Sequence, residues 1–535
     1  MSLKRFTALL GFVDKKQFFP YILLNFVIMN LTRPLIPFFA ARARRTLAKA
    51  ADPEQSQRRQ LHMLLSRGRH TLWGRAHRLE LAAGYEDFRE AMPVTSYPAL
   101  RPYVERMMAG EPDILWPGVC RRFAQSSGTS DGKSKYIPVT ADSLRLNHYR
   151  GGAEAVAHYL NHHRGSRLFD GKAFILGGSF ANELHGLPPS VKVGDLSAHL
   201  IEAINPLVDL IRVPSRATAL MPDWTAKLPA LVSESVGANV TNISGVPSWF
   251  LAVLRRVMER AGASTIHDVW PRLEVFFHGG IAFGPYRSQY AEITDPERMH
   301  YVENYNASEG FFAVQHAPDA PGMMLLTDAG VFYEFVPLGA PDTEAVPAWL
   351  TRQGRSYSLL LTAANGLWRY PIGDVVKVVA TDPLQIVITG RTKHYINAFG
   401  EEVMVHNTDA ALSLACADCR CTVANYTAAP VFTTSTSRGR HQWLIEFDRQ
   451  PADMAAFAAT LDRRLTEQNS DYQAKRAGDI FLAPLTVTVA SPGLFDRWLA
   501  STGKLGGQRK VPRLQNDRKL IDDMLRFNAV SHSDK

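Results

Sequence analysis

A chain of 535 residues is too long for one ordinary hydrophobic core, so at least two domains are expected. With 46% apolar and 21% charged residues, the composition is globular and excludes a mainly disordered protein. The formal net charge is +9, but residues 41–80 alone contribute +7, so the nearly neutral remainder excludes a basic nucleic-acid groove along the whole molecule.

The N-terminal segment contains an uncharged, mostly apolar run at residues 17–32. A membrane span needs about 20 apolar residues, and this run is shorter and interrupted by a proline and two asparagines. Residues 39–42 also make a poor signal-peptide cleavage site. We therefore expect residues 1–50 to form a helical extension that packs on the next domain or lies on a membrane surface, assisted by its basic residues. Full insertion is the less favoured alternative.

Helical patterns dominate residues 55–110, and then residues 125–135 read QSSGTSDGKSK. Glycines let backbone N–H groups turn inward, hydroxyls donate hydrogen bonds and lysines balance charge, which favours a phosphate-binding loop over an ordinary exposed turn. A Walker loop needs four residues between its first glycine and Gly-Lys, followed by a helix. Here three residues intervene and a strand-like segment follows, so the loop is expected to join two strands, and a P-loop NTPase is excluded.

Three later segments each combine an apolar strand pattern with a glycine turn: residues 173–179, 239–245 and 273–280. Helices are predicted at 141–160 and 250–261. Strands that alternate with helices predict an α/β sheet, whose ligands bind at the carboxyl ends of the strands. We therefore expect the three glycine turns, at Gly177, Gly245 and Gly279, to lie near one crevice.

Two carboxylates stand beside turns farther along the chain. Glu309 follows an aromatic and several small polar residues in 301–310, a setting that could hold magnesium while the ring flanks a base, although a glutamate near a serine is also commonplace. Asp374 follows Gly373 and could bind two sugar hydroxyls, or could simply be an aspartate in a hairpin.

After about residue 393 the pattern predicts a small α+β module, with a helix at 452–469 and a strand at 486–489. The segment 503–513 is glycine-rich and cationic, so it either delivers a lysine to an anionic centre or is a solvated loop. Three of the four cysteines form a C-x-x-C-x-C cluster at 416–421. No fourth ligand has a zinc-site spacing, which favours metal-free thiols in a reducing compartment.

In this order, from about residue 60 onward, the motifs resemble the adenylate-forming superfamily, and within it the Gretchen-Hagen acyl acid amido synthetases of the auxin-responsive promoter type, as a bacterial-like member. The matching segments are SSGTSDGKSK at 126–135, GVPSW at 245–249, YNASE at 305–309, YPIGDV at 370–375, Gly390-Arg391 with Lys393, Asn469 with Tyr472 and Arg476, and QRKVPR at 508–513.

The resemblance implies an α/β, firefly-luciferase-like fold. Residues 1–50 would be an extension, 51–392 the large adenylation domain, and 393–535 a small α+β domain that rotates about the hinge Lys393. It also implies an enzyme that uses ATP and Mg²⁺ to convert a small carboxylic acid into an acyl adenylate. An amino acid or other amine then displaces AMP to form an amide.

Residue roles follow from the same resemblance. Nucleotide contacts are expected from Ser126, Ser127, Gly128, Thr129, Ser130, Lys135, Tyr305, Asn306, Ser308, Asp374 and Arg391. Glu309 would hold Mg²⁺. Lys510 is the expected catalytic lysine and Lys504 its rival. His278, beside Gly279, is a candidate for the acyl pocket or the general base, although a histidine at a strand end is more often structural.

Two alternatives are kept: an acyl-CoA ligase that passes the adenylate to a thiol, and a non-catalytic membrane-surface protein that kept the fold. We expect small-molecule substrates, no nucleic-acid partner, a monomer, and a cytoplasmic location with peripheral contact at the inner membrane through residues 1–50 as an option.

Overall fold

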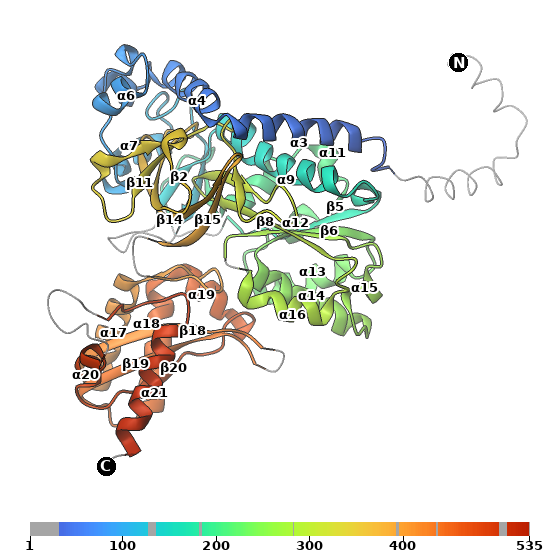
Figure 1. Ribbon diagram of the computed structural model, residues 1–535. Coiled ribbons are helices and arrows are strands. Elements are labelled where there is room, and N and C mark those ends of the chain that lie inside the picture. Colours follow the sequence, from blue (N-terminus) through green and yellow to red (C-terminus); the bar gives the residue numbers. More distant parts are fainter. Residues whose placement is uncertain are drawn as a thin grey trace, which may run out of the picture.

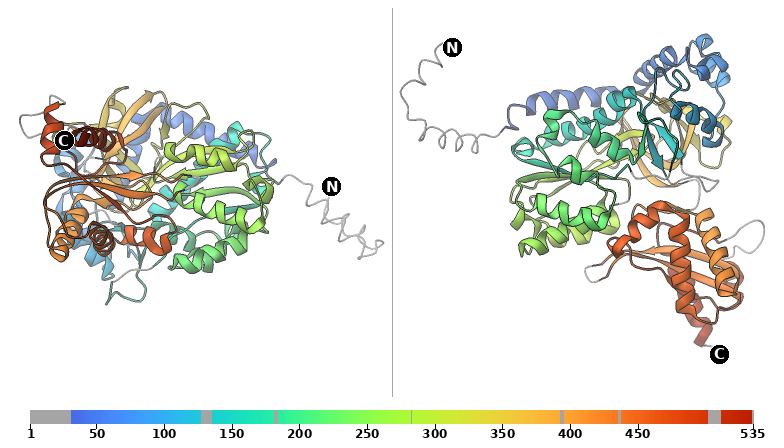
Figure 2. Two further views of the ribbon diagram at one scale, coloured as in Figure 1. Left: turned by 90° about the horizontal axis from the view of Figure 1, so that it is seen from below. Right: turned by 180° about the vertical axis from the view of Figure 1, so that it is seen from behind.

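The computed structural model describes residues 31–126, 135–180, 184–281, 283–391, 395–434, 437–501 and 511–533. Figure 1 shows a large unit, blue to yellow, and a smaller C-terminal unit, orange to red. The view from behind in Figure 2 shows the same division. The expected α/β class with a smaller C-terminal part is confirmed.

A twelve-stranded sheet organises the large unit, in the order β12-β11-β13-β14-β15-β10-β9-β8-β7-β6-β3-β5. Neighbouring strands from β8 to β5 are parallel, and those from β12 to β8 are antiparallel. The strands are β3 (Lys172–Ile175), β5 (Arg212–Val213), β6 (Val240–Gly245), β7 (Val275–Gly279), β8 (His300–Ala307), β9 (Gly310–Val314), β10 (Met323–Leu325), β11 (Val331–Pro337), β12 (Val346–Pro347), β13 (Ser356–Ala363), β14 (Tyr370–Thr381) and β15 (Leu384–Arg391). The strands predicted at 173–179, 239–245 and 273–280 are therefore confirmed as β3, β6 and β7.

Helices cover both faces of the parallel half, because its strands alternate apolar side chains up and down. Val275 and Phe277 pack in the cluster that contains α3 (Ile36–Ala51) and α9 (Tyr149–His162). Phe276, between them, packs on the other face with α13 (Trp224–Ser235), α14 (Pro247–Ala261) and α16 (Arg287–Ile293). The predicted helix at 250–261 is thus α14, and that at 141–160 is α8 (Ala141–Ser143), a π-helical turn and α9.

The remaining elements of the large unit flank the sheet or form a second sheet of the order β2-β1-β4. They are α4 (Pro53–Gly68), α5 (Leu72–Ala76), α6 (Tyr85–Ala91), α7 (Tyr97–Met108), β1 (Arg122–Ser126), β2 (Lys135–Pro138), β4 (Lys192–Gly194), α10 (Leu196–Glu202), α11 (Pro206–Asp209), α12 (Arg216–Ala219) and α15 (Ile266–Val269). The helical region expected at 55–110 corresponds to α4 through α7.

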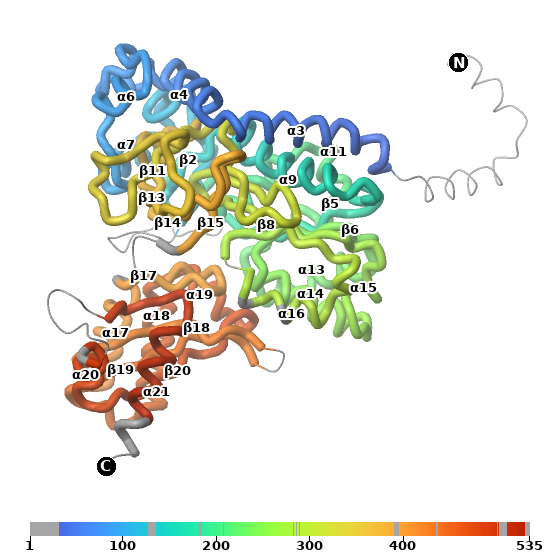
Figure 3. Tube along the Cα trace, in the orientation of Figure 1, coloured from blue at the N-terminus to red at the C-terminus, as the bar shows by residue number. Residues whose placement is uncertain are grey.

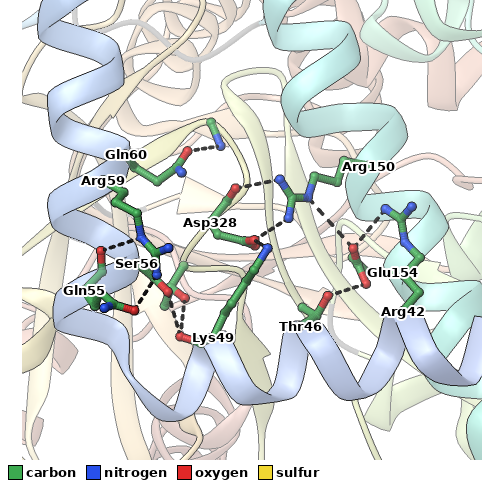
Figure 4. A network of polar contacts seen from close by, with 12 residues as sticks. Arg42, Thr46, Lys49, Gln55, Ser56, Arg59, Gln60, Arg150, Glu154 and Asp328 are labelled. Atoms are coloured by element: carbon green, nitrogen blue, oxygen red, sulfur yellow. Dashed lines mark hydrogen bonds and ion pairs between the residues drawn. The ribbon is translucent and has the colours of Figure 1, made fainter.

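The helix α3 is fixed to the large unit by a polar network (Figure 4). Glu154 of α9 accepts hydrogen bonds from Thr46 at 2.8 Å and Arg42 at 2.9 Å, while Lys49 pairs with Asp328 at 2.5 Å. The described part of the N-terminal extension therefore packs on the domain, as one of the two expectations proposed. Within the described ranges, no helix has the length and apolarity that a bilayer crossing requires. Most of the apolar run at 17–32 lies outside the described residues.

The C-terminal unit is built on a three-stranded sheet of β18 (Thr422–Val431), β19 (Arg440–Arg449) and β20 (Thr486–Val489), with a small β16 (Tyr395–Ile396) and β17 (Val403–Met404) pair. Its helices are α17 (Val405–Cys419), α18 (Met454–Gln468), α19 (Ser470–Arg476), α20 (Leu494–Ser501) and α21 (Lys519–Ser533). The predicted helix at 452–469 and strand at 486–489 are confirmed. All four cysteines are free, and no group of metal ligands occurs among the residues that the structure describes.

The two units share one buried apolar cluster, which runs from β6 and α14 into α17, β18 and β19. At the contact, the rings of Trp224 and Phe481 lie 4.9 Å apart, and the Lys475 ammonium lies 3.7 Å from the centre of the Trp249 ring. The tube in Figure 3 shows the C-terminal unit on the side of the large unit where α13, α14 and α16 lie. The expected hinge, Lys393, lies outside the described residues.

Candidate nucleotide site

A cavity of about 650 Å³ lies between the large unit and the first loops of the C-terminal unit. Its wall is formed by the start of α7, the facing ends of β1 and β2, the end of β7, the turn between β8 and β9, and the start of β14. Residues of the 395–404 segment close it from the C-terminal unit. Parallel strands ending at a domain junction are a common position for a small-molecule site.

Two predicted phosphate contacts stand at this wall. Ser126 ends β1 and Lys135 begins β2, and the two are paired in an antiparallel ladder. The prediction that the serine-rich loop joins two strands is therefore confirmed. Lys135 Nζ donates to the hydroxyl of Tyr370 at 3.0 Å, which directs the ammonium toward the start of β14. Ser127, Gly128, Thr129 and Ser130 lie outside the described residues.

The turn between β8 and β9 brings Ser308 and Glu309 to the same cavity. Asn365 fixes this turn, since its side-chain amide donates to the Glu309 carbonyl at 3.0 Å. Glu309 is only 8% exposed. Because Mg²⁺ commonly binds one or two protein carboxylates together with substrate phosphates, a single carboxylate in the same cavity as Ser126 and Lys135 fits that ion. Asn306 lines the cavity as well.

Asp374 and Tyr305 lie against each other although they are far apart in sequence. The Tyr305 hydroxyl donates to Asp374 Oδ2 at 2.5 Å, and both residues line the cavity while being about 5% exposed or less. Gly373 has a φ of +91°, a conformation that glycine adopts without strain, and it turns the start of β14 to present Asp374. Asp374 therefore lies in a strand, opposite Arg391 of β15, and not in the turn of a hairpin.

His278 does not line the cavity. Its ring is 3% exposed and stacks on Phe283 with centroids 4.3 Å apart, on the α16 face of the sheet. Burial lowers the pKa of His278 to about 3, so the ring is a weak base. Its neighbour Gly279 does line the cavity, and a Cβ there would lie 2.4 Å from the Asn304 carbonyl oxygen.

The three glycine turns, predicted to lie near one crevice, do not all line this cavity. β3, β6 and β7 are neighbours and parallel, so the turns lie at one edge of the sheet. Of the three, Gly279 lines the cavity described here. The Gly177 carbonyl accepts a hydrogen bond from the buried Lys227, and Gly245 packs on Phe250, so these two turns face helices.

Three charged residues of the cavity wall were not predicted: Arg101, Glu303 and Glu402. Arg101 lies on α7, for which the sequence indicated only a helix. Glu303 precedes the predicted 305–309 motif by two residues, and strand alternation could have placed it on the face of β8 that carries Tyr301. The catalytic candidates Lys504 and Lys510 lie outside the described residues.

Hydrogen bonds between the two units hold in place the part of the cavity wall that the C-terminal unit contributes. The Tyr286 hydroxyl donates to the Ala398 carbonyl at 2.6 Å, and Trp249 Nε1 donates to the Phe399 carbonyl at 3.3 Å. Behind them, Glu401 accepts from the Phe399 N–H at 2.6 Å and is bonded to His441 at 2.9 Å. The loop that carries Asn397, Ala398 and Glu402 is thereby fixed against the cavity.

Comparisons with known proteins agree with this architecture. Probable indole-3-acetic acid-amido synthetase GH3.1 of Arabidopsis thaliana is 24% identical over 579 residues, which cover 92% of this chain and 95% of that protein. Jasmonoyl-L-amino acid synthetase GH3.5 of Oryza sativa subsp. japonica is 22% identical, with coverages of 81% and 87%. The solved structure of GH3.15 acyl acid amido synthetase matches with a TM-score of 0.58 at 18% identity, covering 92% of this chain and 96% of that one.

The adenylate-forming fold expected from the motifs is thus confirmed. Family models describe most of the chain. The GH3 family N-terminal domain matches residues 42–299, the GH3 family central domain residues 324–391, and the GH3 family C-terminal domain residues 406–519. Because these matches together span far more than half of its length, the chain belongs to the GH3 family.

Proposed function

We propose that this protein is an ATP-dependent acyl acid amido synthetase, which activates a small carboxylic acid as an acyl adenylate and transfers the acyl group to an amine. One observation carries the proposal. The base of the serine-rich loop, Glu309 and Asp374 line one cavity, although they come from three separate parts of the sequence. ATP requires such a combination of phosphate, metal and ribose contacts.

In the first half-reaction, a carboxylate oxygen of the acid attacks the α-phosphorus of ATP and pyrophosphate leaves. The protein's task is to position the reactants and to neutralise phosphate charge. We assign the polyphosphate to Ser126, Lys135 and the loop between them. Glu309 would hold Mg²⁺, which supplies charge neutralisation at the phosphates. The Lys135–Tyr370 hydrogen bond keeps one cation at the wall before ATP enters.

Asp374 is assigned to the ribose hydroxyls, with Arg391 beside it. A carboxylate can accept two hydrogen bonds from adjacent hydroxyls, and the Tyr305 hydroxyl holds one of its oxygens in place. Tyr305 and Asn306 would border the adenine, and Ser308 would add a hydroxyl. We assign the bridging cation to Lys510, with Lys504 as the rival, and the domain rotation to Lys393.

The substrates are proposed by class. Relatives are named for indole-3-acetic acid and for jasmonoyl-L-amino acid synthesis. Here we propose a small carboxylic acid and an amino acid or other amine. Gly279 and Gly280 line the cavity without side chains, which leaves room beside the adenylate for an acyl group.

Pyrophosphate exchange into ATP tests the first half-reaction. Exchange should depend on one acid from a panel of indole-3-acetate, benzoate and hexanoate, and on Mg²⁺. Mass spectrometry of the products with an amino acid mixture or with coenzyme A then separates amide from thioester. An amide is expected. A thioester would establish the acyl-CoA ligase alternative, and no exchange with any acid would contradict adenylation.

We also propose peripheral membrane contact through the N-terminal extension. At the start of α3, Leu35 and Phe38 are 42% and 65% exposed, and the neighbouring Arg44 and Arg45 are exposed too. An exposed apolar and basic helix end suits an anionic membrane surface. Flotation with vesicles that contain phosphatidylserine should carry the full-length protein and leave a variant with Leu35→Ser and Phe38→Ser behind, because both side chains are exposed and α3 keeps its buried partners. Equal partitioning of the two proteins with the vesicles would contradict membrane contact and would leave the ligase assignment unchanged.

A further inference from the structure

Among the described residues, the cavity wall carries more carboxylates than the proposed nucleotide contacts use. Among the described residues that line it, four are carboxylates, Glu303, Glu309, Asp374 and Glu402, and two are basic, Arg101 and Lys135. The metal and ribose contacts proposed above use Glu309 and Asp374. ATP and an acyl adenylate are anionic, so the further carboxylate of Glu303 suits a different, cationic ligand. The cationic reactant of amide synthesis is the amine, which enters as an ammonium ion because amines of ordinary basicity are protonated at neutral pH.

The sheet register determines where Glu303 points. β7 and β8 are parallel, with Phe277 opposite Val302 and His278 opposite Glu303. Phe277 and Val302 pack in the cluster that contains α9, so the alternating residues Glu303, Tyr301 and His278 face the α16 side of the sheet.

On the α16 side Glu303 lines the cavity, and Gly280 and Ile281 line it as well.

The surroundings leave the Glu303 carboxylate available. Its backbone N–H and C=O are both bonded to Gln315, at 3.1 Å and 2.8 Å, while its carboxylate has no hydrogen bond or ion pair in the part of the chain that the structure describes. Burial raises the pKa of Glu303, and the charge of Arg287, at the start of α16, opposes that rise.

The other titratable groups around Glu303 are His278, Tyr301 and Glu402. Burial lowers the pKa of His278 to about 3, which leaves the ring neutral, and the Tyr301 hydroxyl is hydrogen-bonded to Thr294 at 2.9 Å. Glu402 lines the same cavity from the C-terminal unit. A desolvated carboxylate without a protein partner both attracts a cation and accepts a proton better than an exposed one.

We propose that Glu303 binds the ammonium group of the incoming amine and is the proton acceptor of the second half-reaction. This inference rests on the proposed function. Glu303 first takes one proton from the bound ammonium group and passes it to water, which leaves the amine nitrogen with a lone pair. The nitrogen uses this lone pair to form the bond to the acyl carbon, and the bond between that carbon and the phosphate oxygen breaks. AMP leaves with that electron pair, and the proton released by nitrogen passes to the Glu303 carboxylate and then to water.

The test measures the two half-reactions separately in Glu303→Gln, which keeps size and shape. Acid-dependent pyrophosphate exchange should stay at the wild-type rate. Amide formation with a mixture of the twenty standard amino acids should fall by roughly 10²–10⁴-fold, the usual effect of losing a general base. Hydroxylamine is largely unprotonated at neutral pH, so its acylation should persist in Glu303→Gln. Glu303→Asp retains a carboxylate and should recover part of the amide formation.

Glu274→Gln is a matched control. Glu274 is also a half-buried carboxylate whose pKa is raised by desolvation, but Ser166 and the Arg167 N–H donate to it outside the cavity. Both half-reactions should continue in this variant.

Two results with Glu303→Gln would overturn the proposal: amide formation at the wild-type rate, or an equal loss of exchange, which would assign the residue to acyl binding or to folding. Absence of exchange in the wild-type protein with every acid would instead withdraw the proposed function, and this proposal with it.

Discussion

The polar network under α3 pairs its charged side chains with one another, whereas two partly buried charged side chains of the cavity wall have no such partner among the described residues. In the network, Glu154 is 2% exposed and accepts hydrogen bonds from Thr46 and Arg42, and Asp328 is paired with Lys49 and Arg150 (Figure 4). At the cavity wall, Arg101 and Glu303 have no ion pair and no side-chain hydrogen bond within the described residues. Both wall residues are partly buried, and a bound ligand can supply the counter-charge that they lack.

Breaking the polar network under α3 should cause the largest loss of unfolding free energy. Glu154→Ala leaves Arg42 without its partner and the buried Thr46 hydroxyl without its acceptor. Removing one partner of a buried pair costs about 3–5 kcal/mol, and the partial exposure of Arg42 places this change near 3 kcal/mol. Urea unfolding would measure it. Glu259→Ala, which breaks an exposed pair with Arg256 on α14, should change stability by less than about 1 kcal/mol. Equal losses would contradict the contrast between buried and exposed pairs.

At the cavity wall, substitution should change ligand affinity and not stability. Asp374→Asn can still accept the Tyr305 hydrogen bond, so we expect the fold to persist. The loss of hydrogen bonds from a charged group to the ribose costs about 1.5–3 kcal/mol, which raises the KM for ATP in pyrophosphate exchange roughly 10–100-fold. Tyr305→Phe, which removes only the positioning hydroxyl, should have a smaller effect. An unchanged KM in Asp374→Asn would exclude Asp374 from the ribose site.

The sequence predicts the elements that follow from local patterns, and it does not predict contacts between distant segments. β6, α14, α18 and β20 follow from local patterns of apolar residues, and so were predicted within a few residues. The contact between Tyr305 and Asp374 joins residues 69 positions apart, and no local pattern encodes it.

The side chains of strand β8 show a second reason. Tyr301, Val302 and Glu303 read as one mixed stretch in the sequence, but the register with β7 decides which face each side chain takes. The position of His278 beside Gly279 makes it a candidate base in the sequence, whereas that register directs its ring into the aromatic cluster with Phe283.

His278 offers a third way to accommodate a buried titratable group, which is to stay neutral. Its folded pKa is about 3, below an ordinary unfolded value of about 6.5, so the unfolded state takes up a proton first as the pH falls. Stability is therefore lost as the pH decreases below about 6.5. His278→Phe keeps the aromatic contact with Phe283 and removes this titration. Between pH 7 and 5 the variant should lose about 2 kcal/mol less unfolding free energy than the wild type. Parallel losses in urea unfolding at the two pH values would show that His278 is not held neutral.

The smallest loss of stability is expected for Lys49, an exposed member of the network whose charge solvent can stabilise. Lys49 is 43% exposed at its side chain, and Asp328 keeps Arg150 when Lys49 is removed. Lys49→Met should therefore lower stability by less than about 1 kcal/mol, and added salt should reduce the difference further. Arg150→Met is the matched comparison, because Arg150 donates both to the Asp328 carboxylate and to its carbonyl, the latter at 2.8 Å. If Lys49→Met lowered the free energy of unfolding in urea as much as Arg150→Met, the more exposed ion pair would contribute as much stability as the less exposed one. The separation between buried, partnered charge and charge that solvent or ligand can satisfy would then not hold.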